Sequence, residues 1–386
     1  MAADTGSPHP FVRYRWLLDS YRKAISRGWT DDDFVALVLR LDEAVSGVEG
    51  HGFYITPLSR QSGLAAGLEL DSTYLWVKDE TGNVAGSHKA RHLFGVLLHL
   101  AVDEEDGRNE LGIASCGNAA LAAAVVARAV ERPLRVFIPT WADPQVVERL
   151  EALGAHVEVS ERNPKEKGDP TFLRFQESVA RGLTPFSVQG PITATTLDGG
   201  RTLGWELAEQ LALARVSGPL RLFVQVGGGA LAASVWSGLA GGIREQWLGV
   251  DPILHTVQSE AVAPLNRAWR RLLALEGEAM EAARMTPDLY MWPWEEVGTS
   301  AASGILDDVT YDWLPVMEAM LDSGGRAQVV SEEMILRANE LGRSATGIDV
   351  DHTGTAGLAG LLDSEVASSI SRHEHVVVLF TGRRRA

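Results

Sequence analysis

Apolar residues in this chain follow two alternating spacings, and the alternation predicts the secondary structure. Short apolar runs, read as strands, alternate with longer segments that have helical periodicity. We expect strands at 74–79, 110–115, 134–139, 155–160, 220–226, 253–260 and 375–382, and helices at 89–102, 118–130, 144–154, 202–214 and 230–240. Regular alternation of strands and helices favours an α/β fold built on parallel sheets.

The segment before this alternation has a helical pattern of its own. Apolar residues recur at helical spacing over 11–48, and Thr30 followed by Asp31, Asp32 and Asp33 is a typical helix start. We therefore expect a helical N-terminal extension at 1–50. A larger domain is expected from 51–95 together with 190–386, and a smaller one from 96–189.

Composition narrows the class of protein. The 386 residues are 45% hydrophobic, which is enough for two domains with cores of their own. The formal charge of −16 argues against nucleic acid and against an anionic membrane surface as partners. No apolar run reaches the roughly 18 to 20 residues of a membrane helix. Cys116 is the single cysteine, so an intrachain disulfide is excluded and a reducing cytoplasm is expected.

Three polar, glycine-bearing turns follow predicted strands, where a parallel sheet places its ligands. They are Gly86-Ser87-His88-Lys89, Ser115-Cys116-Gly117-Asn118 and Gly227-Gly228-Gly229. In the third turn, consecutive glycines let backbone N–H groups surround an anion at a helix start, which favours a phosphate site. The alternative is a tight strand-to-helix turn. The turn matches neither GxGxxG nor GxxxxGK[ST], so a nucleotide-binding dehydrogenase is disfavoured.

Lys89 allows two interpretations. A lysine at the start of a solvated helix is commonplace, whereas a buried lysine can act as an amine nucleophile and form a Schiff base. Small and apolar residues follow Lys89, which favours burial. A lysine, an anion cradle and an asparagine turn together suggest a phosphorylated aldehyde as cofactor, namely pyridoxal 5'-phosphate.

At this point the sequence resembles the fold type II pyridoxal-phosphate enzymes, which include threonine synthase, the serine and threonine dehydratases and the tryptophan synthase β family. The shared motifs run in order from about residue 51 to 382: Thr56-Pro57-Leu58, Gly86-Ser87-His88-Lys89, Ser115-Cys116-Gly117-Asn118, Gly227-Gly228-Gly229 and Thr381-Gly382. The resemblance implies two parallel-sheet domains with the cofactor in the cleft between them, a small amino-acid substrate and a homodimer.

The resemblance also implies roles for individual residues. Lys89 would hold the cofactor through a Schiff base and move the α-proton of the substrate. The cofactor phosphate would bind to Gly227, Gly228, Gly229 and Ala230. Asn118 would hydrogen-bond the phenolic oxygen, and Thr381 would present a hydroxyl to the pyridine nitrogen, which favours elimination and replacement over transamination. Hydroxyl and backbone donors for the substrate carboxylate would come from Ser115, Cys116, Gly117 and Ser87.

The residues that bear on the identity of the substrate do not all resemble the same enzyme. His88 and Cys116 depart from the usual residues of the dehydratases and threonine synthases, whereas Asn83 and the Thr381-Gly382 ending resemble threonine synthase. We expect a lyase that removes the α-proton of a small amino acid and expels a β-substituent. The alternatives are a threonine-synthase-like γ-elimination and replacement on a phosphorylated homoserine, or a related β-replacement. A non-catalytic relative is disfavoured, because both Lys89 and the glycine turn are present.

Two other candidates have commonplace interpretations. His373 and His375 are spaced to touch a metal, but no further ligand cluster lies near them in the sequence, so we expect a surface turn and no metal site. Cys116 could be a nucleophile paired with a distant histidine. A small polar residue shaping the substrate turn is the better interpretation.

Overall fold

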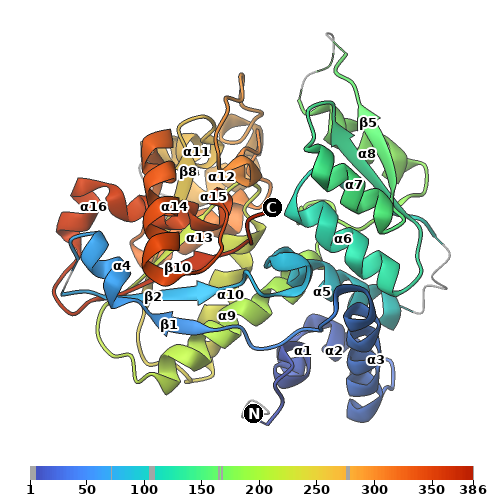
Figure 1. The fold of residues 1–386 in the computed structure, drawn as a ribbon, viewed down its shortest axis with the longest axis horizontal. Helices are drawn as coiled ribbons and strands as arrows, with labels where there is room; N and C mark the ends of the chain where they lie inside the picture. The colour runs from blue at the N-terminus through green and yellow to red at the C-terminus, as the bar shows by residue number, and fades with distance from the viewer. Residues whose placement is uncertain are drawn as a thin grey trace. The chain divides into compact units, whose positions relative to one another are not determined.

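The chain forms two compact α/β units (Figure 1). The computed structural model describes residues 6–385 apart from 71, 104–108, 164, 165, 167 and 275–278. Unit 1 comprises Met1–Ile55 and Asn83–Thr202, and unit 2 comprises Thr56–Gly82 and Leu203–Ala386. Two parallel-sheet units and N-terminal helices were expected, and both are confirmed. The boundaries differ from those predicted: the extension and Lys89 both belong to unit 1.

Unit 1 is built on a four-stranded sheet with the order β5-β4-β3-β6, in which every pair is parallel. Its strands are β3 (Leu111–Ala114), β4 (Leu134–Pro139), β5 (His156–Ser160) and β6 (Thr184–Pro185). Helix α8 packs on β3, β4 and β5, while α6 packs on β3 and β4. The helices are α1 (Pro10–Arg13), α2 (Asp19–Ser26), α3 (Asp31–Glu49), α5 (Lys89–Val102), α6 (Asn118–Ala129), α7 (Pro144–Ala152) and α8 (Pro170–Ala180), with 3₁₀ turns η1 (Arg15–Leu17) and η2 (Val84–Gly86).

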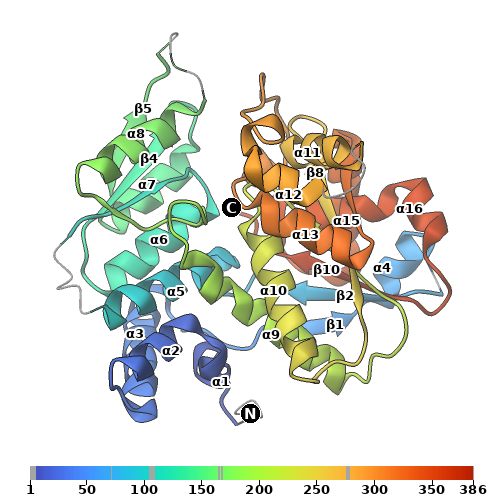
Figure 2. The same cartoon turned by 180° about the vertical axis from the view of Figure 1, so that it is seen from behind.

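The N-terminal helices pack on their own unit. Helix α2 contacts α5 and α3 contacts α6, in agreement with the neighbouring blue and teal ribbons of Figures 1 and 2. Phe11 and Phe34 are fully buried, and the Phe11 ring lies 4.7 Å from that of Phe94. Helix α3 begins after Thr30, where the sequence indicated a helix start, and Thr30 and Asp33 form a reciprocal capping box there. The apolar stripe of the extension is thus largely covered by the same chain.

Unit 2 is built on a six-stranded sheet with the order β1-β2-β10-β7-β8-β9. Only the β1–β2 pair is antiparallel within this sheet. Its strands are β1 (Leu58–Arg60), β2 (Tyr74–Asp79), β7 (Leu220–Gln225), β8 (Pro252–Ser259), β9 (Arg326–Val330) and β10 (His375–Phe380). The last strand of the chain therefore lies between β2 and β7.

Helices cover both faces of this sheet. Helix α15 packs on β10, β7 and β8, and α14 packs on α15, whereas α10 packs on β7 and α13 on β8. The helices are α4 (Ser62–Gly67), α10 (Ala230–Arg244), α11 (Pro264–Leu273), α12 (Ala279–Met285), α13 (Trp313–Ser323), α14 (Glu332–Thr346), α15 (His352–Ala359) and α16 (Ser364–Ser369), with 3₁₀ turns η3 (Pro287–Leu289), η4 (Ser303–Ile305) and η5 (Gly360–Leu362). Helix α9 (Thr196–Leu213) begins in unit 1 and ends in unit 2.

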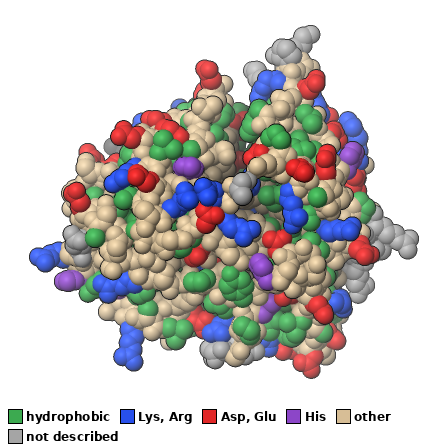
Figure 3. All heavy atoms as spheres, viewed as in Figure 1, with side chains coloured by type: hydrophobic (Ala, Val, Ile, Leu, Met, Phe, Trp, Pro, Cys, Tyr) green, Lys and Arg blue, Asp and Glu red, His purple; other side chains and the backbone are tan. Residues whose placement is uncertain are grey.

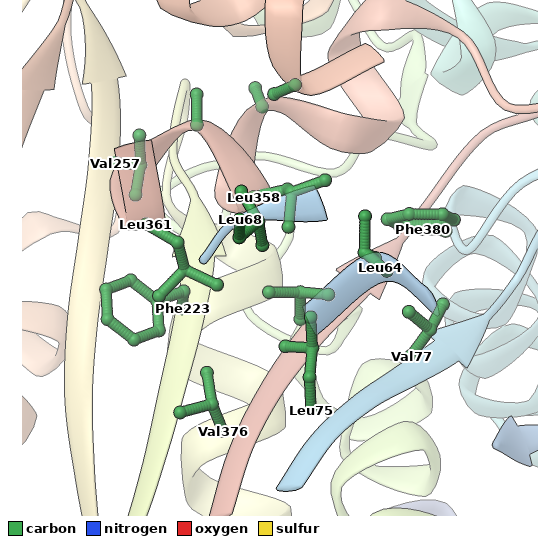
Figure 4. Packing of buried hydrophobic residues seen from close by; sticks show 14 of the residues in the cluster. Leu64, Leu68, Leu75, Val77, Phe223, Val257, Leu358, Leu361, Val376 and Phe380 are labelled. Atoms are coloured by element: carbon green, nitrogen blue, oxygen red, sulfur yellow. The ribbon is translucent and has the colours of Figure 1, made fainter. Parts of the chain in front are cut away.

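A buried apolar cluster fixes α15 against the sheet of unit 2. Phe223 of β7, Leu358 of α15 and Phe380 of β10 belong to it and are fully buried, and Figure 4 shows them with Leu64, Leu75 and Val376. Phe380 directly precedes Thr381, so this packing fixes the backbone that leads into a predicted site residue.

Three observations bear on the classes of protein considered above. No described helix combines the length and the apolar character needed to cross a membrane. Acidic side chains are distributed over the face drawn in Figure 3 rather than gathered in one region. Within the same described residues, no group of three or more His, Cys, Asp or Glu residues is placed to hold a metal ion. His375 instead accepts a hydrogen bond from Trp76 Nε1 at 3.1 Å.

Candidate active site

Lys89 is the first residue of α5 and is partly buried. The turn before it is held locally: Asn83 Oδ1 accepts a hydrogen bond from the Val84 N–H at 2.8 Å, and Asn83 O accepts one from the Gly86 N–H at 2.8 Å. Ala85 and Gly86 have φ values of 54° and 66°. Left-handed backbone at a non-glycine residue is strained, and such strain clusters at functional sites. The sequence thus folds a constrained turn that delivers one lysine at a helix start.

The second predicted turn lies in the same unit. Ser115 follows β3, and its N–H donates to Phe137 O at 3.2 Å. Ser115 Oγ accepts from the Gly117 N–H at 3.3 Å, and Asn118 is the first residue of α6. η2, which precedes Lys89, contacts α6. The structure therefore brings the Lys89 turn and the Asn118 helix together, and the dipole at the amino end of that helix favours an anion.

The glycine turn connects β7 to α10 in unit 2. Thr310 Oγ1 donates to Gly227 O at 3.0 Å, and the Asp312 N–H donates to Gly228 O at 2.9 Å. These bonds hold the carbonyl oxygens of the turn. Among the described residues, the N–H groups of Gly227, Gly228 and Gly229 meet no hydrogen-bond acceptor. Three such donors at a helix start fit the phosphate of a cofactor.

Side chains cannot be added to this turn without a clash. A Cβ on Gly227 would lie 2.2 Å from Asp307 Oδ2 and 2.9 Å from Ile305 Cα. Gly229 has a φ of 95°, which favours glycine. The segment that follows η4 therefore packs tightly over the turn. Ala230 is the first residue of α10, so its N–H belongs to the same helix start.

Thr381 lies beside the glycine turn at one edge of the sheet. It follows β10, which pairs in parallel with β7, and the carboxyl ends of neighbouring parallel strands share an edge. The Thr381 side chain is 2% exposed, and its Oγ1 accepts a hydrogen bond from Gln225 Nε2 at 2.9 Å. Lys89, Ser87 and the Ser115–Asn118 turn thus come from unit 1, whereas the glycine turn and Thr381 come from unit 2.

Sequence reasoning missed Gln225 and the 305–312 segment. A single amide in the apolar run LRLFVQV was the available signal for Gln225. For the 305–312 segment the sequence offered only the glycine at 304. One residue of the family motifs has a structural role instead: the Thr56 N–H donates to Glu206 Oε2 at 3.2 Å, and Glu206 pairs with Lys78.

The chain is similar to known proteins over most of its length. Residues 51–382 match the family model described as pyridoxal-phosphate dependent enzyme. A threonine synthase of Methanosarcina acetivorans is 26% identical over 85% of this chain and 74% of its own length. A serine dehydratase-like protein of Mus musculus is 30% identical over 48% of this chain and 52% of its own. The processed threonine deaminase isoform 2 of Solanum lycopersicum has the same fold, with a TM-score of 0.67, 17% identity and coverage of 92% and 91%.

Proposed function

The chain belongs to the pyridoxal-phosphate dependent enzymes of fold type II, and from that premise we propose that it is a lyase acting on a small amino acid. The reaction would remove the α-proton and expel a β-substituent, as in serine and threonine dehydratases and ammonia-lyases. When bound, pyridoxal phosphate supplies the electron sink for such chemistry. The residues of this chain would supply binding, orientation and proton transfer.

The roles divide between the two units. Lys89 Nζ would bond covalently to the cofactor aldehyde and would then carry the α-proton of the substrate. The N–H groups from Gly227 to Ala230 would hold the cofactor phosphate. Among the described residues, those of Gly227, Gly228 and Gly229 meet no hydrogen-bond acceptor, which supports this role. Thr381 would face the ring nitrogen with its hydroxyl, and Asn118 would bond the phenolic oxygen.

The substrate carboxylate would bind at the amino end of α6. Ser115 Oγ and the backbone donors of Cys116 and Gly117 lie at that end, where the helix dipole favours an anion. Ser87, buried beside Lys89, would complete the set of donors.

The contact between Asp307 and the glycine turn is the observation that favours a lyase over an enzyme for a phosphorylated substrate. The Asp307 carboxylate lies against Gly227, and Asp308 and Asp312 belong to the same segment. The turn offers donors for the phosphate of the cofactor, whereas a phosphate on the substrate would need donors of its own, and the 307–312 segment offers it carboxylates instead. A substrate with an unphosphorylated side chain avoids that repulsion.

A threonine-synthase-like reaction is the second candidate. It is supported by similarity to threonine synthases over 85% of the chain, which is longer than the stretch shared with the dehydratases. Asn83 and the Thr381-Gly382 ending favour it as well. In this reaction the substrate would be a phosphorylated homoserine, or a replacement reaction would use a related β-substituted amino acid.

Product identification separates the two candidates. The purified protein, loaded with pyridoxal phosphate, is incubated in parallel with serine, threonine and O-phosphohomoserine, and the products are identified by mass spectrometry. A 2-oxo acid and ammonia from serine or threonine support the lyase. Threonine formed from O-phosphohomoserine overturns it in favour of the synthase. Each product has to disappear with Lys89→Ala, which excludes a contaminating enzyme.

We also propose a cytoplasmic homodimer, on the basis of the family resemblance and the single cysteine. Light scattering coupled to size-exclusion chromatography measures the mass directly. A species of twice the 41.7 kDa chain mass is expected, and a species of one chain mass would contradict the proposal.

A further inference from the structure

A buried amide lies two residues before the glycine turn. Gln225 ends β7 and is 3% exposed. Its Nε2 has four oxygens within reach: Thr381 Oγ1 at 2.9 Å, Thr353 O and Gly354 O at 3.0 Å each, and Leu379 O at 3.4 Å. All of these groups belong to unit 2, and the shortest contact is to a predicted cofactor residue.

The surroundings fix which way the amide points. Backbone carbonyl oxygens only accept hydrogen bonds, so the end of the Gln225 side chain that faces three of them has to be the NH₂ group. The contact with Thr381 is therefore an N–H that donates to a hydroxyl oxygen. Because the hydroxyl oxygen accepts from Gln225, the hydroxyl directs its own hydrogen to a different acceptor.

The oxygen of the Gln225 amide lowers the stability of the folded protein. Gln225 Oε1 is buried and makes no hydrogen bond among the described residues. A Cβ on Gly357 would lie 2.8 Å from this oxygen, so the close approach of α15 leaves it without access to water. An unsatisfied buried oxygen destabilises a protein, and an apolar side chain of the same length would avoid the cost. The retained amide points to a use for its N–H groups.

We propose that Gln225 is a positioning residue that turns the Thr381 hydroxyl into a hydrogen-bond donor toward the ring nitrogen of the cofactor. The inference rests on the role proposed above for Thr381. A hydroxyl that donates to this nitrogen keeps it unprotonated, which tempers the electron sink and favours elimination over transamination. Gln225 would therefore influence reaction specificity without contact with the reacting atoms.

A purely structural role is the competing explanation, because Gln225 also binds the first turn of α15. The chain offers a matched control. Gln328 of β9 is 7% exposed, and its Nε2 donates to Gly360 O at 3.4 Å just beyond the end of α15. Its Oε1 also meets no partner within the part of the chain that the structure describes. Gln328 thus resembles Gln225 in burial and in its contact near α15, but among the described residues it makes no hydrogen bond to Thr381.

The test measures the protonation of the ring nitrogen of the cofactor. Wild type, Gln225→Met, Gln328→Met and Thr381→Val are each loaded with pyridoxal phosphate labelled with ¹⁵N in the ring, and the ¹⁵N resonance is followed against pH. We expect the wild-type nitrogen to be unprotonated. Gln225→Met should raise the pKa of the ring nitrogen by about one unit, a change of about tenfold in its protonated fraction. Thr381→Val should shift the resonance further, and Gln328→Met should leave it unchanged.

Each outcome decides between the explanations. A resonance that moves in Gln225→Met but not in Gln328→Met supports the positioning role. If Thr381→Val moves it and Gln225→Met does not, Gln225 is structural and the inference is overturned, while the role of Thr381 stands. If neither variant moves it, the proposed role of Thr381 fails as well. Gln225→Leu serves as a second donor-free variant; if both lose the cofactor while Thr381→Val keeps it, Gln225 acts only through α15 and the inference is overturned.

Discussion

Lys78 and Lys89 lie close together in the sequence, but their surroundings differ. Lys78 is in β2 and fully buried, and its Nζ lies 2.7 Å from Glu206 Oε2, 2.7 Å from Thr56 O and 2.9 Å from Gln210 Oε1. Lys89 begins α5 and is only partly buried. A search for the most buried lysine of this stretch would select Lys78.

The difference shows that burial alone does not identify a nucleophilic amine. The three N–H donors of Lys78 meet three acceptors, one of them a carboxylate, and this is the arrangement of a structural ammonium group. Lys89 instead stands at a helix start, where the positive end of the dipole gives a cation no stabilisation. It also follows a turn with left-handed backbone at Ala85. Position at the end of a constrained turn, rather than depth, distinguishes the candidate catalytic lysine.

Replacement of Lys89 should give the largest functional effect. In Lys89→Ala we expect activity to fall by about three orders of magnitude or more, because both the covalent attachment and the proton carrier are lost. Borohydride should no longer trap the cofactor on the protein, and mass spectrometry of the intact chain measures this. The free energy of unfolding should change by only about 1 kcal/mol. Trapped cofactor in Lys89→Ala would remove Lys89 from its role.

Replacement of Lys78 should instead act mainly on the free energy of unfolding. Lys78→Met leaves the Glu206 carboxylate buried without its cation, which typically costs about 3–5 kcal/mol of unfolding free energy. Denaturant titration of the cofactor-free protein measures the loss. The double variant Lys78→Met/Glu206→Leu should recover much of it, because no charge is then buried alone. A single variant as stable as wild type would show that the ion pair contributes little.

Alteration of the glycine turn should weaken cofactor binding. The Cβ of Gly227→Ala would meet Asp307 Oδ2 at 2.2 Å and the backbone at Ile305, so the turn and its N–H groups have to move. We expect the affinity for pyridoxal phosphate to fall about tenfold or more, the equivalent of one hydrogen bond to a charged group. Fluorescence titration measures it. Gly47→Ala in α3 is the control, because nothing lies within 4 Å of its Cβ; equal affinity in both variants would contradict the phosphate role.

The buried side chain of His255 should have a smaller, pH-dependent effect on the free energy of unfolding. Burial, aided by Arg221 and Arg326, lowers the pKa of His255 to about 3. The folded state therefore favours the neutral ring, whereas the unfolded chain takes up a proton below about pH 6.5. This contribution to stability is present above pH 6.5 and is lost as the pH falls toward 3. In His255→Phe the free energy of unfolding should decline less between pH 6.5 and 4; an unchanged decline would contradict the assignment.

The sequence was most informative about local structure. Apolar periodicity placed α5 at Lys89–Val102 as predicted, and β4 at Leu134–Pro139, because the spacing of buried side chains follows directly from helix and strand geometry. The capping box at Thr30 was equally local. The resemblance to the fold type II enzymes then identified the cofactor and the order of the site motifs. It did not explain Thr56 and Glu206, which form part of the ion-pair network around Lys78.

Pairings between distant residues were decided by the tertiary structure. Gln225 and Thr381 are separated by 156 positions and Lys78 and Glu206 by 128, and no periodicity encodes either contact. They exist because β10 lies between β2 and β7, because α15 packs on β7 and β10, and because Glu206 of α9 reaches Lys78 of β2. The contact of Asp307 with the glycine turn has the same origin. By itself the sequence determined the elements, the cofactor class and the order of the turns. Strand order and helix packing decided which polar groups meet in the interior, because burial forces each of them to find a partner there.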